Sequence, residues 1–205
     1  MQRDQNDLAT GRHLTESRAR EEIARYCALL WERRLVTGTS GNVSVRLEDG
    51  DIIVTPTQVS LRAIAASQLV RTDAGGDPRQ GQGQPTSELP LHVAAYQARP
   101  DVRAIIHTHP TFCVVWSKTG AVFDRDTVGA RETLGEVAWT PYEPPGSQAL
   151  ARVTAAEFSR GIDTVLMERH GLSAVASTLE QAYVATDLAE EAARIAFFSR
   201  FLPER

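Results

Sequence analysis

The apolar residues of the chain change their spacing several times, and each change predicts a new element. From residue 23, apolar side chains recur at i, i+3, i+4, i+7 and i+8, which predicts an amphipathic helix over about 16–35. A Gly-rich turn at 37–42 follows. Val43, Val45 and Leu47 then alternate with polar residues and predict a strand. The turn signal at 48–51 predicts a hairpin partner over about 51–55.

The rest of the chain alternates helical and strand patterns. Residues 73–84 are rich in Gly, Gln and Asp and predict an exposed loop. Caps and periodicity predict helices from Thr86 or Ser87 to about 99, from near 110, over 147–159 and over about 178–201. Buried strands are predicted at 102–107, 164–167 and 172–176.

Neither a repeat nor a linker interrupts this pattern. It predicts a single α/β domain over residues 15–205, with a mostly antiparallel central sheet flanked by helices. The chain has 205 residues, of which 42% are hydrophobic and 23% charged, as in globular proteins. We expect residues 1–14, which are polar, to form a disordered tail.

Charge and hydropathy exclude several classes of protein. The net charge of −4 argues against a nucleic-acid binder. The polar N-terminus lacks the apolar region of a signal peptide, and no apolar run approaches the roughly 18 residues of a membrane span. We therefore expect a cytoplasmic protein that binds neither nucleic acid nor membrane.

The two cysteines make no disulfide framework. Cys27 falls on the apolar stripe of the first predicted helix and is interpreted as a small core residue. Cys113 follows the predicted strand at 102–107 closely enough to approach a metal there, but a packing role is favoured.

Histidines form the sharpest local pattern. His107 and His109 stand at i and i+2 near a strand end, so both imidazoles would point to one face and could share an ion. His170, in a polar turn before Gly171, could complete a three-histidine set with an open position, as in catalytic metal sites. Solvated or hydrogen-bonded histidines are the alternative. His92 and His13 are expected to be structural or solvated.

Short motifs in a fixed order make the chain resemble the class II aldolase/adducin family. The similarity covers nearly all of 21–201. Its segments are residues 38–46, 55–57, 85–88, 94–101, 107–109, 141–142 and 169–172. Each segment is short, but the ordered set is highly specific. The resemblance implies an αβα fold around a nine-stranded sheet, and a homotetramer with active sites at subunit interfaces.

The resemblance also assigns roles to residues. It implies that His107, His109 and His170 bind one Zn²⁺ per subunit, or another divalent transition metal, and that Glu88 is the catalytic carboxylate. From the residues alone, Glu88 is a first-turn acid favoured by the helix dipole. The positions that surround a substrate phosphate in the family are matched by Thr39, Gly41, Asn42, Thr57, Thr86 and Ser87.

Physical chemistry is consistent with these anion-binding positions. Gly41 would let backbone N–H groups approach an anion, and hydroxyls and the Asn42 amide would add donors. Ser87 would lie at a helix N-terminus, which favours anions. From composition alone, residues 39–42 are more readily a plain helix-to-strand turn, and the resemblance reverses that preference.

The reaction implied is the cleavage of a ketose 1-phosphate, similar to fuculose 1-phosphate, by a zinc-dependent aldehyde-lyase. The products are dihydroxyacetone phosphate and an aldehyde. The ion would polarise the ketose carbonyl and stabilise the enediolate, which Glu88 protonates. Sugar phosphate is therefore the expected small-molecule partner.

Two departures from the family's sugar-phosphate aldolases bear on the substrate. Those enzymes have a tyrosine from the adjacent subunit where this chain has Thr127 by rough register, within the charged segment 124–132. Asp126, Arg131 or Glu132 could substitute, or the segment could be a solvated loop. Gln58 stands where Gly usually follows the Thr-Pro-Thr motif.

Four alternatives remain open. A pentulose-phosphate 4-epimerase would use the same retro-aldol step. A sugar-acid-phosphate decarboxylase would need a cation for its carboxylate, for which Arg131 is a candidate. A methylthioribulose-phosphate dehydratase usually has Cys in place of Glu88. A non-enzymatic adducin-like scaffold typically lacks the metal ligands that this chain keeps.

Overall fold

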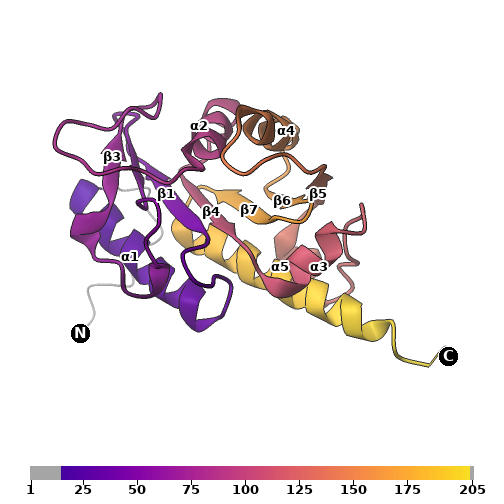
Figure 1. Cartoon of the computed structure of the whole chain (residues 1–205). Helices are drawn as coiled ribbons and strands as arrows, with labels where there is room; N and C mark the ends of the chain where they lie inside the picture. The colour runs from indigo at the N-terminus through magenta and orange to yellow at the C-terminus, as the bar shows by residue number, and fades with distance from the viewer. Residues whose placement is uncertain (1–14, 204–205) are drawn as a thin grey trace.

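The computed structural model describes residues 15–203, and the tail expected at residues 1–14 lies outside the described residues. Seven strands form one sheet in the order β3-β2-β1-β4-β7-β6-β5 (Figure 1). The strands are β1 (Asn42–Arg46), β2 (Ile52–Val54), β3 (Val70–Thr72), β4 (Ala104–Thr108), β5 (Val137–Thr140), β6 (Thr164–Met167) and β7 (Gly171–Ala176).

Every neighbouring pair of strands is antiparallel except β5 and β6. This confirms the predicted single α/β domain with a mostly antiparallel sheet. The implied count of nine strands is wrong for the described residues, because two further pairings stop at single bridges, Pro56↔Pro85 and Thr72↔Pro78. Proline has no N–H to donate, so a ladder does not extend through these positions.

Helices cover both faces of the sheet. The helices are α1 (Glu16–Glu32), α2 (Leu89–Ala98), α3 (Thr111–Ser117), α4 (Gln148–Ser159) and α5 (Leu179–Ser199). Figure 1 shows α1 and α5 on one side of the sheet and α2 and α4 on the other. Short 3₁₀ turns at Leu61–Ala63 and Ala66–Gln68 and a π turn at Ala130–Leu134 complete the described elements. None of the helices in the described part of the chain is long and apolar enough to span a membrane.

Alternation along the central strands divides the core between the two layers. Val43, Val45 and Ile106 pack in the cluster that includes α1 and the start of α5. Ile105, on the opposite face of β4, packs in the cluster that includes Tyr96 of α2. Successive strand residues point to opposite faces, so His107 lies on the same face as Ile105, toward α2 and α4.

Helix ends differ from the sequence predictions where backbone geometry intervenes. The first helix ends at Glu32 and not at residue 35, because Arg34 takes a φ of 58° and the Leu35 N–H returns to the Leu30 carbonyl at 2.9 Å. The last helix begins, as predicted, after Thr178, whose hydroxyl accepts from the Gln181 N–H at 3.2 Å.

The start of α2 also differs from the prediction, and Glu88 lies at this point. We predicted Thr86 or Ser87 as its cap, whereas the helix begins at Leu89 with Glu88 in the cap position. Thr86 still contributes, since its hydroxyl accepts from the Glu88 N–H at 3.2 Å. The two strands that sequence patterns missed, β3 and β5, have only three and four residues.

Candidate metal centre

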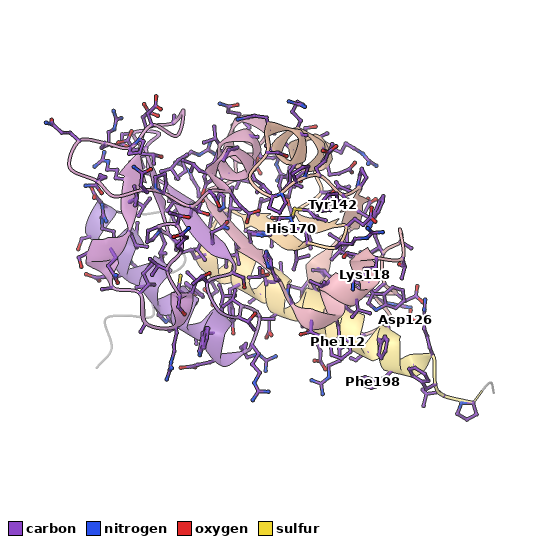
Figure 2. All side chains as sticks on the ribbon, viewed as in Figure 1. Phe112, Lys118, Asp126, Tyr142, His170 and Phe198 are labelled. Carbon is purple, nitrogen blue, oxygen red and sulfur yellow. The ribbon has the colours of Figure 1, made fainter. Side chains whose placement is uncertain are left out.

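Four side chains from distant parts of the chain converge at one end of β4. Glu88 immediately precedes α2, His107 lies in β4, His109 follows that strand, and His170 lies in the turn between β6 and β7. One potential ligand atom from each lies within 4.8 Å of the others. His107 is fully buried, Glu88 and His170 are 7% and 8% exposed, and His109 is partly exposed. Figure 2 labels His170 in the turn that leads into β7.

The close approach of two strand ends brings His170 to His109. The antiparallel register places Thr108 of β4 opposite Leu172 of β7. A Cβ on Gly171 would lie 2.2 Å from the Thr108 carbonyl oxygen and 2.8 Å from Cδ2 of His109. Only glycine therefore lets β7 start this close to the His109 ring. The three imidazole rings then stand with centroids 4.8 to 4.9 Å apart.

The hydrogen bonds of His107 assign its tautomer. Its Nδ1 lies 3.0 Å from the Leu172 carbonyl oxygen and 3.1 Å from the Ser173 hydroxyl. A carbonyl oxygen can only accept, so Nδ1 carries a proton and Nε2 is the nitrogen that can offer a lone pair to a metal. Nε2 lies 2.9 Å from Nε2 of His109 and 2.9 Å from Oε2 of Glu88.

Electrostatics keep the donor atoms of this cluster free. Burial raises the pKa of Glu88, but His107 and His170 outweigh that effect and hold the pKa well below its usual range. Burial, reinforced by the two other rings, lowers the pKa of His109 to about 3. At neutral pH the cluster thus combines the carboxylate of Glu88 with the unprotonated imidazole of His109.

This donor set fits a divalent cation. Nε2 of His107, Nε2 of His109 and a carboxylate oxygen of Glu88 face one another, so a cation between them could accept a lone pair from each. Three imidazoles with a carboxylate suit zinc or a neighbouring transition metal better than Ca²⁺ or Mg²⁺, which prefer oxygen ligands. The second contacts of His107, to Leu172 and Ser173, are of the kind that orient metal-binding histidines.

Of the six residues predicted to bind phosphate, two are joined to the cluster. The Asn42 amide donates from Nδ2 to Oε2 of Glu88 at 2.9 Å, and Thr86 accepts from the Glu88 N–H. Both are buried. Asn42 pairs with His107 across β1 and β4, so this strand register brings it to the site.

The other four lie around these two. Thr57 is half-buried and its N–H donates to Gln84, next to the segment that carries Thr86. Gly41 leaves no room for a side chain, because a Cβ there would lie 2.6 Å from Val36 Cγ1 and 3.0 Å from the His107 carbonyl oxygen. Thr39 and Ser87 are exposed, and no described hydrogen bond joins their side chains to the cluster. Their role in anion binding stays a prediction.

Gln58 stands out for its backbone. It has a φ of 57°, in the left-handed region that favours glycine, and its side chain is exposed. A glycine at this position in related enzymes is therefore explained by conformation alone.

The charged segment at 124–132 has its own contacts. Arg131 pairs with Asp126 at 2.8 Å, and both side chains are largely exposed. Thr127 accepts from the Ala130 N–H at 3.3 Å and so caps the π turn. The segment borders a cleft of about 580 Å³ that none of the four cluster residues lines. Figure 2 shows Asp126 well away from His170, toward the C-terminal end of the molecule.

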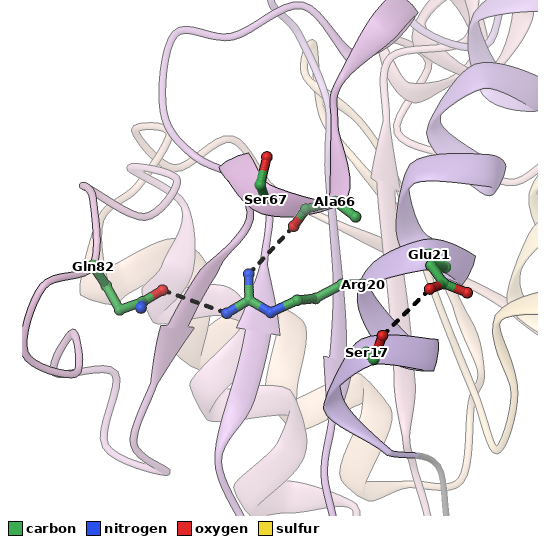
Figure 3. A pocket seen from close by; sticks show the side chains of 6 residues that line it. All are labelled: Ser17, Arg20, Glu21, Ala66, Ser67 and Gln82. Carbon is green, nitrogen blue, oxygen red and sulfur yellow. Dashed lines mark hydrogen bonds between the residues drawn. The ribbon is translucent and has the colours of Figure 1, made fainter.

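A second cleft, of about 260 Å³, lies between α1 and the loops beside β3 (Figure 3). Its one cation, Arg20, is already bound: Nη1 donates to the carbonyls of Ala66 and Leu69, and Nη2 to Gln82. Arg20 also pairs with Glu16 at 2.7 Å. These contacts make Arg20 a link between α1 and the 3₁₀ turn, and we assign the cleft no function.

The structure also tests the predictions that were made for the two cysteines and for His92. Cys27 and Cys113 are fully buried in two apolar clusters, which confirms the packing role for both. His92 is fully buried and hydrogen-bonded, as expected for a structural histidine. His13 lies outside the described residues.

Comparison with known proteins identifies a family and several related enzymes. The model of the class II aldolase and adducin N-terminal domain matches residues 21–197. The chain is 31% identical over 175 residues to an L-fuculose phosphate aldolase of Methanococcus maripaludis, covering 85% of this chain and 93% of that protein. It is 33% identical over 187 residues to a 3-oxo-tetronate 4-phosphate decarboxylase of Cupriavidus necator, covering 88% and 84%.

Solved structures show the same fold. An L-fuculose 1-phosphate aldolase superposes with a TM-score of 0.86 at 29% identity, covering 95% of this chain and 92% of that chain. The family match extends over most of the sequence and includes every residue of the Glu88 and histidine cluster. The chain therefore belongs to the class II aldolase and adducin family.

Proposed function

We propose that the protein is a zinc-dependent aldehyde-lyase that cleaves a ketose 1-phosphate, similar to fuculose 1-phosphate, into dihydroxyacetone phosphate and an aldehyde. The observation that carries the proposal is the convergence of Glu88 with His107, His109 and His170 within 4.8 Å. The relative from Methanococcus maripaludis supports the substrate class.

Within this proposal the three histidines hold the ion and Glu88 moves the proton. A bound divalent cation supplies a Lewis acid that polarises the ketose carbonyl and stabilises charge on the enediolate. In the aldol direction the Glu88 carboxylate would remove a proton from the substrate carbon, and in the direction of cleavage it would return to that carbon a proton first taken up from solvent. Its Oε2 is held by Asn42, and its N–H by Thr86, so the carboxyl group is ordered before substrate arrives.

The remaining assignments follow from the same proposal. Thr39, Gly41, Asn42, Thr57, Thr86 and Ser87 would surround the substrate phosphate. A cytoplasmic homotetramer with active sites at subunit interfaces is the expected assembly, and a group from a neighbouring subunit would take the place of the missing tyrosine. Nothing in a single chain tests these points, and they stay predictions.

Glu88→Gln tests the proposal directly. We expect the variant to keep about one divalent ion per chain, because three histidines remain. We also expect it to lose exchange of solvent deuterium into dihydroxyacetone phosphate. Glu157→Gln is the matched control, since Arg160 is the one ion-pair partner of that carboxylate among the described residues and the pair lies outside the cluster. Wild-type protein that purifies without metal and is indifferent to chelators would overturn the metal assignment, and unchanged exchange in Glu88→Gln would reassign the base.

A second candidate reaction is decarboxylation of a 3-oxo acid phosphate. The relative from Cupriavidus necator, 33% identical, favours it. Loss of CO₂ beside a carbonyl also leaves an enediolate that needs a proton, so Glu88 would have the same role. Arg131, our candidate for the substrate carboxylate, is paired with Asp126. Product analysis on ketose 1-phosphates and on 3-oxo acid phosphates, by aldehyde and CO₂ release, separates the two reactions.

A further inference from the structure

A polar row crosses the contact between α2 and β1, where an apolar contact would be usual. On the helix side, Glu88, His92 and Tyr96 stand at i, i+4 and i+8. On the strand side, Asn42, Ser44 and Arg46 stand at i, i+2 and i+4. Four helical residues rise about 6 Å and two strand residues about 6.6 Å, so the two rows stay nearly in step.

Each helical residue meets the strand residue opposite it. Glu88 accepts from Asn42 at 2.9 Å. Nε2 of His92 bonds Oδ1 of Asn42, and its Nδ1 lies 2.7 Å from the Ser44 hydroxyl. The Ser44 hydroxyl is also 2.8 Å from the Tyr96 hydroxyl. One continuous hydrogen-bonded chain therefore runs from Tyr96 to the carboxylate of Glu88.

The charge of Glu88 sets the direction of every bond in this chain. An ionised carboxylate only accepts, so Asn42 must turn its NH₂ group toward Glu88 and its oxygen toward His92. That oxygen needs a donor, which makes Nε2 of His92 the protonated nitrogen. Burial lowers the pKa of His92 to about 3, so its ring is neutral and Nδ1 accepts from Ser44.

We propose that His92 is a positioning residue for the catalytic carboxylate: by donating from Nε2 to Asn42, it holds the amide that orients Glu88 toward the three histidines. The inference rests on the proposed role of Glu88. It also gives Asn42 a task besides anion binding, because the described bonds already engage both ends of its amide.

A purely structural role for His92 would be to tie α2 to β1 through Ser44. Two amide substitutions separate this role from positioning. The amide of His92→Gln reaches about as far as Nε2 and can keep the bond to Asn42, whereas the shorter amide of His92→Asn replaces Nδ1 and can keep only the bond to Ser44. Thr186→Val, which removes a buried hydroxyl bonded only to its own helix, is the control for buried polarity.

The first measurement is deuterium exchange into dihydroxyacetone phosphate by zinc-loaded protein. Loss of a residue that orients an active-site group typically costs about 10–100-fold. We expect His92→Asn to lose exchange by that factor at unchanged KM, His92→Gln to keep most of it, and Thr186→Val to match wild type. Equal exchange in His92→Asn and wild type, or equal loss in the two His92 variants, would overturn the proposal.

The second measurement does not depend on activity. Nitrogen-15 NMR of metal-free wild-type protein should show a neutral His92 with its proton on Nε2, and a proton on Nδ1 would overturn the proposal even if a variant fails to fold. Crystal structures of the metal-free variants should show Glu88 in its wild-type rotamer in His92→Gln and displaced in His92→Asn. Wild-type protein that exchanges no deuterium would reject the proposed function, while these structural results would still decide the positioning role.

Discussion

Gly171→Ala should damage both the fold and the metal centre, because it inserts one methyl group where two strands nearly touch. The added Cβ would lie 2.2 Å from the Thr108 carbonyl oxygen and 2.8 Å from Cδ2 of His109. The first neighbour is a backbone atom at the end of the β4–β7 pairing and cannot rotate away. The strand ends must therefore separate, and the His109 ring must leave its place in the cluster.

The magnitude follows from the cost of overpacking a well-packed interior. Forced backbone and rotamer shifts of this kind cost about 1–3 kcal/mol. In a chain of this size each kcal/mol lowers Tm by roughly 2–4 °C. We therefore expect a Tm between about 2 and 12 °C below wild type for the metal-free protein. Zinc affinity should fall as well, since one of its proposed ligands moves.

Urea and thermal unfolding at one fixed protein concentration would measure the stability change, and competition with a chelator the affinity. Gly83→Ala is the matched control, because a Cβ there meets only Val70 at 3.8 Å, an ordinary contact. A Gly171→Ala protein within about 0.5 kcal/mol of wild type, the range of a neutral surface change, would refute the steric reasoning. Normal stability with lost zinc binding would confine the effect to His109.

Two further predictions concern stability. Burial lowers the folded-state pKa of His92 and of His109 to about 3, from 6.5 in the unfolded chain. Protonation therefore favours the unfolded state, and stability of the metal-free protein should be full above about pH 6.5 and decline as pH falls toward 3; a urea midpoint that is unchanged between pH 7.5 and pH 4.5 would contradict this. The carboxylate of Glu190 accepts from the Phe112 and Cys113 N–H groups at 3.0 Å and so caps α3, whose own cap residue, Pro110, offers no side-chain acceptor. Glu190→Ala should lose about 1–2 kcal/mol in urea unfolding, as when a helix cap is removed, while Glu191→Ala, next in sequence and paired only with Arg194 at 3.9 Å, should match wild type.

Local patterns predicted the elements wherever local energetics decide them. The helices with a hydroxyl cap, α4 after Ser147 and α5 after Thr178, begin where the sequence indicates. Two helices lack such a cap: α3 begins near residue 110 as predicted, whereas the cap position of α2 was misplaced by one or two residues. Strands β3 and β5 are too short for a two-residue period to be recognised, and pairing with longer neighbours forms them.

The site depends on contacts that no local pattern contains. His107 and His109 were recognisable from their spacing, but the position of His170 depends on the register of β4 with β7 and on the space left by Gly171. Both are properties of residues more than 60 positions apart, as the bond from His107 to Leu172 shows. The place of His170 in the site was therefore indicated by the resemblance to a known family, because residue spacing alone did not determine it.

The contact between α2 and β1 could nevertheless be predicted from the polar residues in the sequence. A helix that packs on a sheet normally presents apolar residues at i, i+4 and i+8, yet this one presents Glu88, His92 and Tyr96. The strand row at 42, 44 and 46 is polar as well, although Asn42 and Ser44 are buried. Burying two polar rows is costly unless they satisfy each other, so their common step of about 6 Å is itself a prediction that they meet. The row ends on a carboxylate whose partners are the proposed metal-binding histidines, and this direction is the reason for assigning His92 a proposed positioning role.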